Sequence, residues 1–163
     1  IAKCPWATTG RTHQHTPNII TSLELDPAEM EKRNIHLQKK YAEIEENEVR
    51  FEELHCEDAE YLIVAFGSCA RIAQKAMEMA REEGIKVGLL RPITLWPFPS
   101  KAIAARAAQV KGILTVELNA GQMVEDVRLA VKCKVPVEHF GRLGGIVPDP
   151  DEVITALKEK LIK

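Results

Sequence analysis

Short apolar runs alternate with amphipathic segments along most of the chain, beginning near residue 60. Four of these runs have the length of a strand, over residues 61–66, 86–90, 113–118 and 135–140. Within them apolar residues follow one another almost without interruption, which is typical of strands that are covered on both faces of a sheet. We therefore expect four buried strands.

A segment with helical periodicity follows each expected strand. After the third strand, apolar residues recur with a period of 3.6 over residues 123–131, and charged residues occupy the opposite face. The same reasoning predicts helices over residues 67–83 and 100–109, and from residue 150 on. Four strand–helix alternations predict an α/β fold, a three-layer α/β/α sandwich with a mainly parallel sheet and right-handed crossovers.

The first quarter of the chain has a different pattern. Residues 1–22 show neither helical nor strand periodicity, so we expect an extended arm. Asp26-Pro27-Ala28-Glu29 is a strong helix start, and the helix that we expect to run to residue 46 carries one narrow apolar stripe. Such a helix lies on a surface, of the sheet domain or of a partner. We expect residues 1–57 to form an interdomain connector and residues 58–163 to form the α/β domain.

Composition and charge argue against several classes of protein. The chain has 22 basic and 24 acidic side chains and a net charge of −2, so it lacks the basic field of a nucleic-acid-binding protein. No apolar stretch approaches the roughly 20 residues that cross a bilayer. We expect a soluble, cytoplasmic protein that does not bind a membrane. Because the sequence begins with Ile1 rather than Met, we also expect a piece of a longer polypeptide.

The cysteines and histidines do not form a recognisable metal site. The histidines of the HxH sequence, His13 and His15, have no further ligand at a suitable spacing, so a polar loop is the favoured interpretation. The four cysteines are scattered without a CxxC pair. Cys69 lies in a strand-to-helix turn where a helix N-terminus could activate a thiol, but a small buried thiol is the commoner case.

Polar residues and glycines gather where the expected strands end. In open α/β sheets this edge is where ligands bind. The functional interpretation is a polar rim that meets a neighbouring domain or subunit near an active site; in the alternative, Arg91 and Glu117 pair with each other across adjacent strands. The candidate rim residues are Gly67, Ser68, Arg91, Glu117, Asn119, Gln122, Gly141 and Arg142.

Chemical activity of this rim has little support in the sequence. Ser68, His139 and Glu117 are the residue types of a catalytic triad, but no GxSxG elbow surrounds the serine. The glycine-rich sequence GRLGG at residues 141–145 would suit an anion, yet it precedes a proline-rich connection, so a plain turn is favoured. We therefore predict no catalytic, cofactor-binding or metal-binding residue in this chain.

Two aromatic residues lie in a proline-punctuated stretch after the second strand. Trp96 and Phe98 either form an exposed patch for a partner or fold back over the sheet as part of the core. Interfaces and cores are both enriched in such residues, and we favour the partner interpretation.

Three longer runs carry a resemblance to a known family. They are GIKVGLLRPITLWPFP at residues 84–99, VELNAGQMVEDVRLAV at residues 116–131 and FGRLGGIVPDPDEV at residues 140–153. The chain resembles the second domain of the alpha subunit of 2-oxoacid:ferredoxin oxidoreductases, which is related to the C-terminal domain of transketolases. The upstream run PNIITSLELDPAEMEKRNIHLQKKYAEIEENEVRFEE is similar to the connector of the branched-chain, 2-oxoisovalerate type, so the resemblance covers essentially the whole chain.

The resemblance implies a role in oxidative decarboxylation, in which a 2-oxoacid, coenzyme A and oxidised ferredoxin give acyl-CoA, carbon dioxide and reduced ferredoxin. In this family thiamine pyrophosphate, magnesium and iron–sulfur clusters belong to other domains and subunits. The implied partners are a preceding thiamine-binding domain, a beta subunit, further subunits, and ferredoxin as electron acceptor. The isolated chain is expected to be inactive, as a non-catalytic assembly domain.

Other assignments stay open at this stage. The substrate could be 2-oxoglutarate or pyruvate instead of a branched-chain 2-oxoacid. In another class, the domain is an independent module that binds a nucleotide or coenzyme A, or a scaffold without contact to the active site. The sequence also leaves open whether the chain forms a homo-oligomer.

Overall fold

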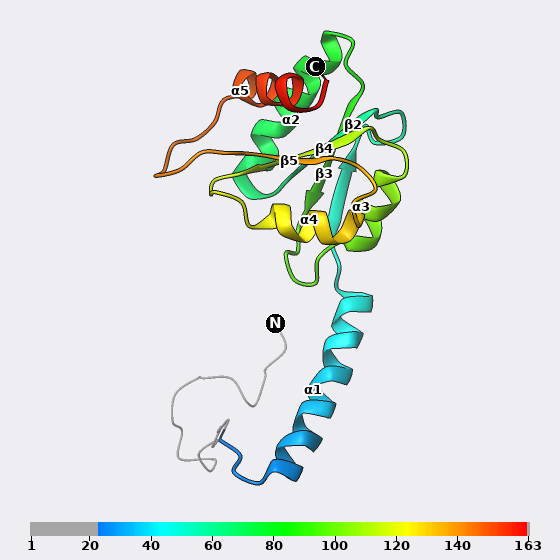
Figure 1. Cartoon of the computed structure of the whole chain (residues 1–163), viewed down its shortest axis with the longest axis vertical. Coiled ribbons are helices and arrows are strands. Elements are labelled where there is room, and N and C mark those ends of the chain that lie inside the picture. The colour runs from blue at the N-terminus through cyan, green and yellow to red at the C-terminus, as the bar shows by residue number, and fades with distance from the viewer. Residues whose placement is uncertain (1–22, 163) are drawn as a thin grey trace, which may run out of the picture. The chain divides into compact units, whose positions relative to one another are not determined.

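The computed structural model describes residues 23–162 (Figure 1). The chain divides into two compact units, residues 1–40 and residues 41–163. The expected arm over residues 1–22, with His13 and His15, lies outside the described residues.

Helix α1 spans Pro27–Asn47 and begins where the capping sequence predicts. The Asp26 carboxylate accepts hydrogen bonds from the backbone N–H groups of Ala28 at 2.8 Å and Glu29 at 3.2 Å. These bonds satisfy two of the N–H groups that a helix start leaves without partners. No residue of α1 is buried, so the docking of its apolar stripe stays a prediction.

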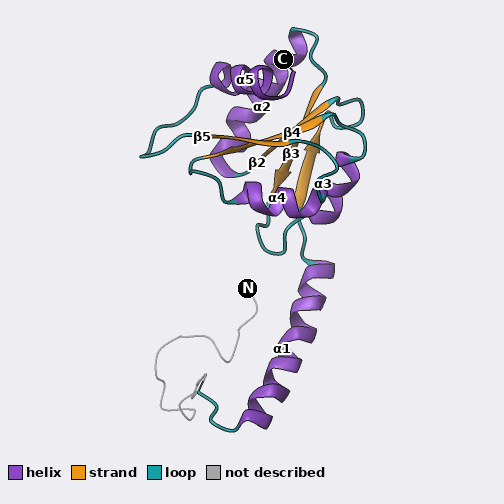
Figure 2. Ribbon diagram, in the orientation of Figure 1, coloured by secondary structure: helices purple, strands orange, loops and turns teal. Residues whose placement is uncertain are grey.

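Within residues 23–162, five strands form one sheet in the order β1-β3-β2-β4-β5. The strands are drawn in orange in Figure 2. They are β1 (Phe51–Leu54), β2 (Tyr61–Ala65), β3 (Val87–Pro92), β4 (Gly112–Glu117) and β5 (Val137–Gly141). The pairs β2–β3, β2–β4 and β4–β5 are parallel, whereas β1 lies antiparallel to β3 at one side of the sheet. The sheet is therefore mainly parallel, as predicted.

Helices cover both faces of the sheet. They are α2 (Gly67–Glu82), α3 (Ser100–Ala107), α4 (Met123–Val131) and α5 (Pro150–Leu157), followed by a short π-helical turn, η1 (Lys158–Ile162). One apolar core lies between the sheet and the helices α2 and α5, and a second lies between the sheet and the helices α3 and α4. The predicted three-layer α/β/α fold is confirmed.

Strand β1 lies inside the segment that the sequence assigned to the connector, and it was not predicted. Its sequence, FEEL, has two adjacent acids and no apolar run. The acids are paired with arginines from other elements: Glu52 with Arg91 of β3 at 2.9 Å, and Glu53 with Arg106 of α3 at 2.6 Å. Because these partners are distant in sequence, no local pattern indicates the strand.

None of the helices within residues 23–162 has the length and apolar character that a bilayer crossing requires.

Candidate functional site

The four parallel strands end at one edge of the sheet, which we call the carboxyl edge. It consists of the connections that follow β2, β3, β4 and β5, which are residue 66 and residues 93–99, 118–122 and 142–149. Helices α2, α3, α4 and α5 begin directly after these connections. All candidate rim residues lie on this edge or next to it.

Glu117, the last residue of β4, is fully buried. Its carboxylate accepts three hydrogen bonds from the start of α4, from the backbone N–H groups of Gln122 at 3.1 Å, Met123 at 2.8 Å and Val124 at 3.0 Å. The first N–H groups of a helix have no partner within the helix and carry its positive end. The side chain of Glu117 therefore supplies the cap of α4.

His139 on β5 joins this arrangement from the neighbouring strand. Its Nδ1 atom lies 3.2 Å from Thr115 Oγ1 and 3.4 Å from Glu117 Oε1, and its Nε2 atom lies 3.2 Å from the carbonyl oxygen of Asn119. Gly141 lies so close to this carbonyl oxygen that a Cβ atom there would overlap it. Strand β4, the turn after it and β5 are thus held together by side chains of the edge.

The structure does not support a catalytic triad. His139 and Glu117 do lie together, but the carboxylate is already bonded to three backbone N–H groups. Ser68 is exposed at the start of α2, and among residues 23–162 its side chain makes no hydrogen bond. A triad needs the serine hydroxyl to bond to the histidine, and this contact is absent there.

The alternative expected from the sequence, in which Arg91 pairs with Glu117, is wrong. Strand β2 lies between β3 and β4, so the two residues are not on adjacent strands. Arg91 instead bonds to Glu52, its partner in the antiparallel register of β1 and β3. The sequence could not indicate this pair, because β1 itself was not predicted.

Arg142, the arginine of the GRLGG sequence, is also used within the fold. It bonds to Glu152 in the first turn of α5 at 2.7 Å. Glu152 forms a capping box with Asp149, in which each side chain accepts from the backbone N–H of the other residue. Gly144 and Gly145 are exposed and have positive φ values of 65° and 84°. This geometry fits the predicted plain turn.

Two hollows along the carboxyl edge are lined by candidate residues. The smaller, of about 180 Å³, is lined by Phe66, Leu95, Glu117, Gln122, Met123 and Asp126. It brings together the connections that follow β2, β3 and β4. Gln122, an exposed candidate residue, lines this hollow. Gly67 and Ser68 do not line it, because they form the start of α2, where Gly67 has a φ of 57°.

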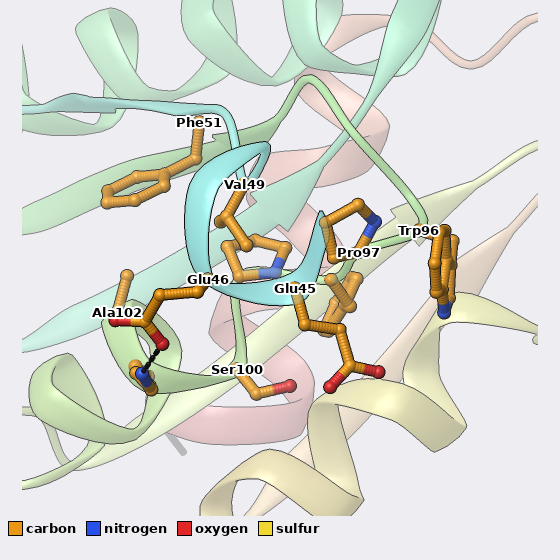
Figure 3. A pocket seen from close by; sticks show the side chains of 11 residues that line it. Glu45, Glu46, Val49, Phe51, Trp96, Pro97, Ser100 and Ala102 are labelled. Atoms are coloured by element: carbon orange, nitrogen blue, oxygen red, sulfur yellow. Dashed lines mark hydrogen bonds and ion pairs between the residues drawn. The ribbon is translucent and has the colours of Figure 1, made fainter. Parts of the chain in front are cut away.

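The larger hollow, of about 580 Å³, is a groove beside the connection between β3 and α3 (Figure 3). Trp96 and Phe98 both line it, together with Phe51 and the glutamates Glu45 and Glu46. Trp96 is 55% exposed and meets Tyr41 edge-on, with ring centroids 5.6 Å apart. Phe98 is partly buried against the core under α3. Trp96 therefore fits the interpretation as an exposed patch, whereas Phe98 fits the alternative of a side chain packed on the core.

Two of the described cysteines, Cys56 and Cys69, are not activated thiols. Cys69 is buried, and burial raises its pKa, with a smaller contribution from the charge of Glu117. Burial, assisted by the charge of Glu53, raises the pKa of Cys56 to about 11. Cys133 is exposed. Within residues 23–162, no group of three or more histidine, cysteine or acidic side chains could hold a metal ion.

The exposed surface of the carboxyl edge is more apolar than the sequence analysis expected. Its charged residues bond within the fold, while seven large apolar side chains of the edge are exposed. They come from three connections, those after β3, β4 and β5. These residues, which we call the edge apolar set, are Ile93, Leu95, Trp96, Leu118, Leu143, Ile146 and Val147. Apolar residues in predicted loops were the signal that could have identified them.

Comparison with known proteins identifies the family. A family model described as "Pyruvate:ferredoxin oxidoreductase core domain II" matches residues 59–153. Ketoisovalerate oxidoreductase subunit VorB of Methanothermobacter thermautotrophicus is 47% identical over 154 residues, which are 94% of this chain and 43% of that protein. The chain therefore spans less than half the length of this curated relative.

Solved structures support the same assignment. The 2-oxoglutarate:ferredoxin oxidoreductase from Magnetococcus marinus, solved with 2-oxoglutarate, coenzyme A and succinyl-CoA bound, has a TM-score of 0.72 and 26% identity, covering 83% of this chain and 24% of that chain. A split-gene transketolase, solved as an inactive beta4 tetramer, shares the fold with a TM-score of 0.59 at 20% identity, over 69% of this chain and 41% of that one. The chain belongs to the core domain II family of pyruvate:ferredoxin oxidoreductases.

Proposed function

We propose that this chain is a non-catalytic assembly domain of the alpha subunit of a thiamine-pyrophosphate-dependent 2-oxoacid:ferredoxin oxidoreductase that acts on 2-oxoisovalerate and other branched-chain 2-oxoacids. The observation that carries the proposal is the 47% identity to a ketoisovalerate oxidoreductase subunit over 94% of the chain. The complex converts 2-oxoacid, coenzyme A and oxidised ferredoxin into acyl-CoA, carbon dioxide and reduced ferredoxin.

The chemistry of the carboxyl edge supports a non-catalytic role. A thiamine pyrophosphate site needs carboxylates free to bind magnesium and N–H groups free to bind phosphate. At this edge the Glu117 carboxylate and the N–H groups at the start of α4 already bond to each other, and Arg142 is paired with Glu152. Glu117, Arg142 and the start of α4 are therefore not free to hold the cofactor, and the proposal places thiamine pyrophosphate, magnesium, coenzyme A and the iron–sulfur clusters on other parts of the complex.

The proposal also names the partners. They are a thiamine-binding domain of the same subunit, a beta subunit, further subunits, and ferredoxin as the electron acceptor. The cytoplasmic location expected from the sequence is part of the same proposal. A second substrate, 2-oxoglutarate, has support in the likeness to the Magnetococcus marinus enzyme, but the identity there is 26% against 47% for the VorB relative.

Calorimetric titration of the chain tests the assembly role against the binding-module alternative. We expect no binding heat with coenzyme A, ATP, FAD or magnesium thiamine pyrophosphate at millimolar concentration, because Glu117, Arg142 and the N–H groups at the start of α4 are already bonded. Circular dichroism of the same sample controls for folding. Saturable heat with coenzyme A or ATP would instead establish a ligand-binding module.

A second experiment asks whether the edge affects turnover or only assembly. Gln122→Ala and Asp126→Asn change side chains that line the smaller hollow, while Glu125→Gln changes an exposed side chain of the same helix that does not line it. If the edge shapes a wall near the active site, the first two variants lower turnover per assembled complex and the third does not. Unchanged turnover in all three would establish a pure scaffold.

A further inference from the structure

The exposed apolar side chains of the α/β unit are concentrated on one edge. The seven members of the edge apolar set are each 45% to 60% exposed. On the helices α2 to α5, the one large apolar side chain of comparable exposure is Leu129, which is 74% exposed on α4. Single apolar residues are normal on a protein surface, but a group on adjoining connections indicates an interaction surface.

The connections that carry the edge apolar set adjoin one another. Leu95 lines the same hollow as Glu117 and Gln122, so the connection after β3 meets the one after β4. The N–H group of Arg142 donates to the carbonyl oxygen of Glu117 at 3.3 Å, which joins the end of β4 to the connection after β5. The three connections that carry the set therefore adjoin one another where they leave the sheet.

Three polar side chains of this edge have hydrogen-bond partners within the fold before any partner binds. Glu117 is bonded to α4, the Asn119 side chain accepts from the N–H group of Gly121 at 2.7 Å, and Arg142 is bonded to Glu152. Covering these three side chains would leave them with their hydrogen bonds, so the cost of burying unpaired polar groups is avoided for them. The edge is suited to packing against an apolar surface of another folded unit.

The lengths of the relatives indicate which folded unit packs against the edge apolar set. The match to VorB leaves more than half of that polypeptide outside the aligned region, and the matched fold makes up 24% of the chain of the Magnetococcus marinus enzyme. A domain of a longer chain is held next to its neighbours at a high effective concentration. Resting on the proposed function, we infer that the edge apolar set packs against the remaining part of the same alpha-subunit polypeptide, and not against the beta subunit or a second copy.

Site-specific photo-crosslinking in the full-length alpha subunit, assembled with its partner subunits, tests this inference. Leu118 and Leu143 are each replaced by p-benzoylphenylalanine, and Leu129 is replaced in the same way as a matched exposed control. After irradiation, gel mobility separates links within one polypeptide from links between polypeptides, and mass spectrometry locates the linked residues. Two edge positions are used so that the result does not depend on the folding of one variant.

We expect both edge positions to link within one polypeptide, to residues outside the 163-residue segment, with at least tenfold higher yield than position 129. Links from the edge to another subunit or to a second copy would overturn the inference, as would equal yields at all three positions. A natural polypeptide of only these 163 residues would overturn it too. Turnover of 2-oxoisovalerate in the same preparation tests the proposed function separately, because the links report packing whether or not the complex has that activity.

Discussion

Glu117 has a role in the structure that differs from the one expected from the sequence. At the end of an expected strand, an acid is a candidate for the rim of a site, and its position at the carboxyl edge was predicted correctly. Its burial and its three bonds to α4 depend on how the turn over residues 118–122 brings the start of the helix back to the end of β4. Sequence reasoning therefore located the residue but did not identify its structural role.

Replacing Glu117 tests this role. Glu117→Gln retains the size of the side chain but removes the charge and directs an NH₂ group toward backbone N–H groups. We expect the free energy of unfolding in urea to fall by about 2–4 kcal/mol, because buried hydrogen bonds are lost and donors face donors.

Glu125 provides the matched control for this variant. It lies in the first turn of the same helix but is exposed. Glu125→Gln should change the free energy of unfolding by less than about 0.5 kcal/mol. Equal effects of the two substitutions would show that the buried cap is not important for stability.

Thiol reactivity separates the three described cysteines. In a Cys4→Ser background, iodoacetamide at pH 8 should label Cys133 first, since it is exposed. Cys56 should react at least about 100-fold more slowly, because a pKa of about 11 leaves little thiolate at that pH, and burial also restricts access. Cys69 should be slow for the same two reasons. Rapid labelling of Cys56 or Cys69 in the folded protein would contradict the buried core described here.

At the scale of elements, the four parallel strands and the helices between them follow from the sequence. Their apolar runs are local and continuous, so each is recognisable without knowledge of its neighbours. Strand β1 is different, because its two glutamates are neutralised by arginines about 39 and 53 residues away. Strand β1 is stabilised by side-chain pairs with elements that are distant in the sequence, and a single sequence does not reveal such pairs.

The pair of Glu53 and Arg106 predicts a pH dependence of stability. The bonds to Arg106 lower the pKa of Glu53 in the folded chain, so this carboxylate stabilises the fold above the ordinary glutamate pKa of about 4.3. That stabilisation is lost as the pH falls through the ordinary value and then through the lowered one. Glu53→Gln should therefore cost about 1–2 kcal/mol at pH 7 and progressively less below about pH 4.

Urea unfolding at several pH values provides the measurement. Glu48→Gln is the control, because Glu48 forms only a long, exposed contact with Arg50, at 3.7 Å. A cost of Glu53→Gln that is the same at pH 7 and pH 3 would show that the carboxylate charge is not what holds β1 to α3.

At the scale of the whole molecule, the three-layer fold was predictable and the character of the candidate surface was not. Strand order places β2 between β3 and β4, which separates Arg91 from Glu117 and leaves each with a different partner. Once such partners are assigned, the charged residues of the polar rim expected from the sequence are bonded within the fold, and seven large apolar side chains are exposed on the same edge. Order and pairing of strands are properties of the complete sheet, and no single segment encodes them.

The most direct test of the central proposal is turnover by the assembled complex. The full-length polypeptide, co-expressed with its partner subunits, is assayed with 2-oxoisovalerate, 2-oxoglutarate and pyruvate in the presence of coenzyme A and a viologen acceptor. The 163-residue chain alone is the control. We predict activity only in the complex, highest with 2-oxoisovalerate. Activity of the isolated chain, or a complex inactive toward all three 2-oxoacids, would contradict the account.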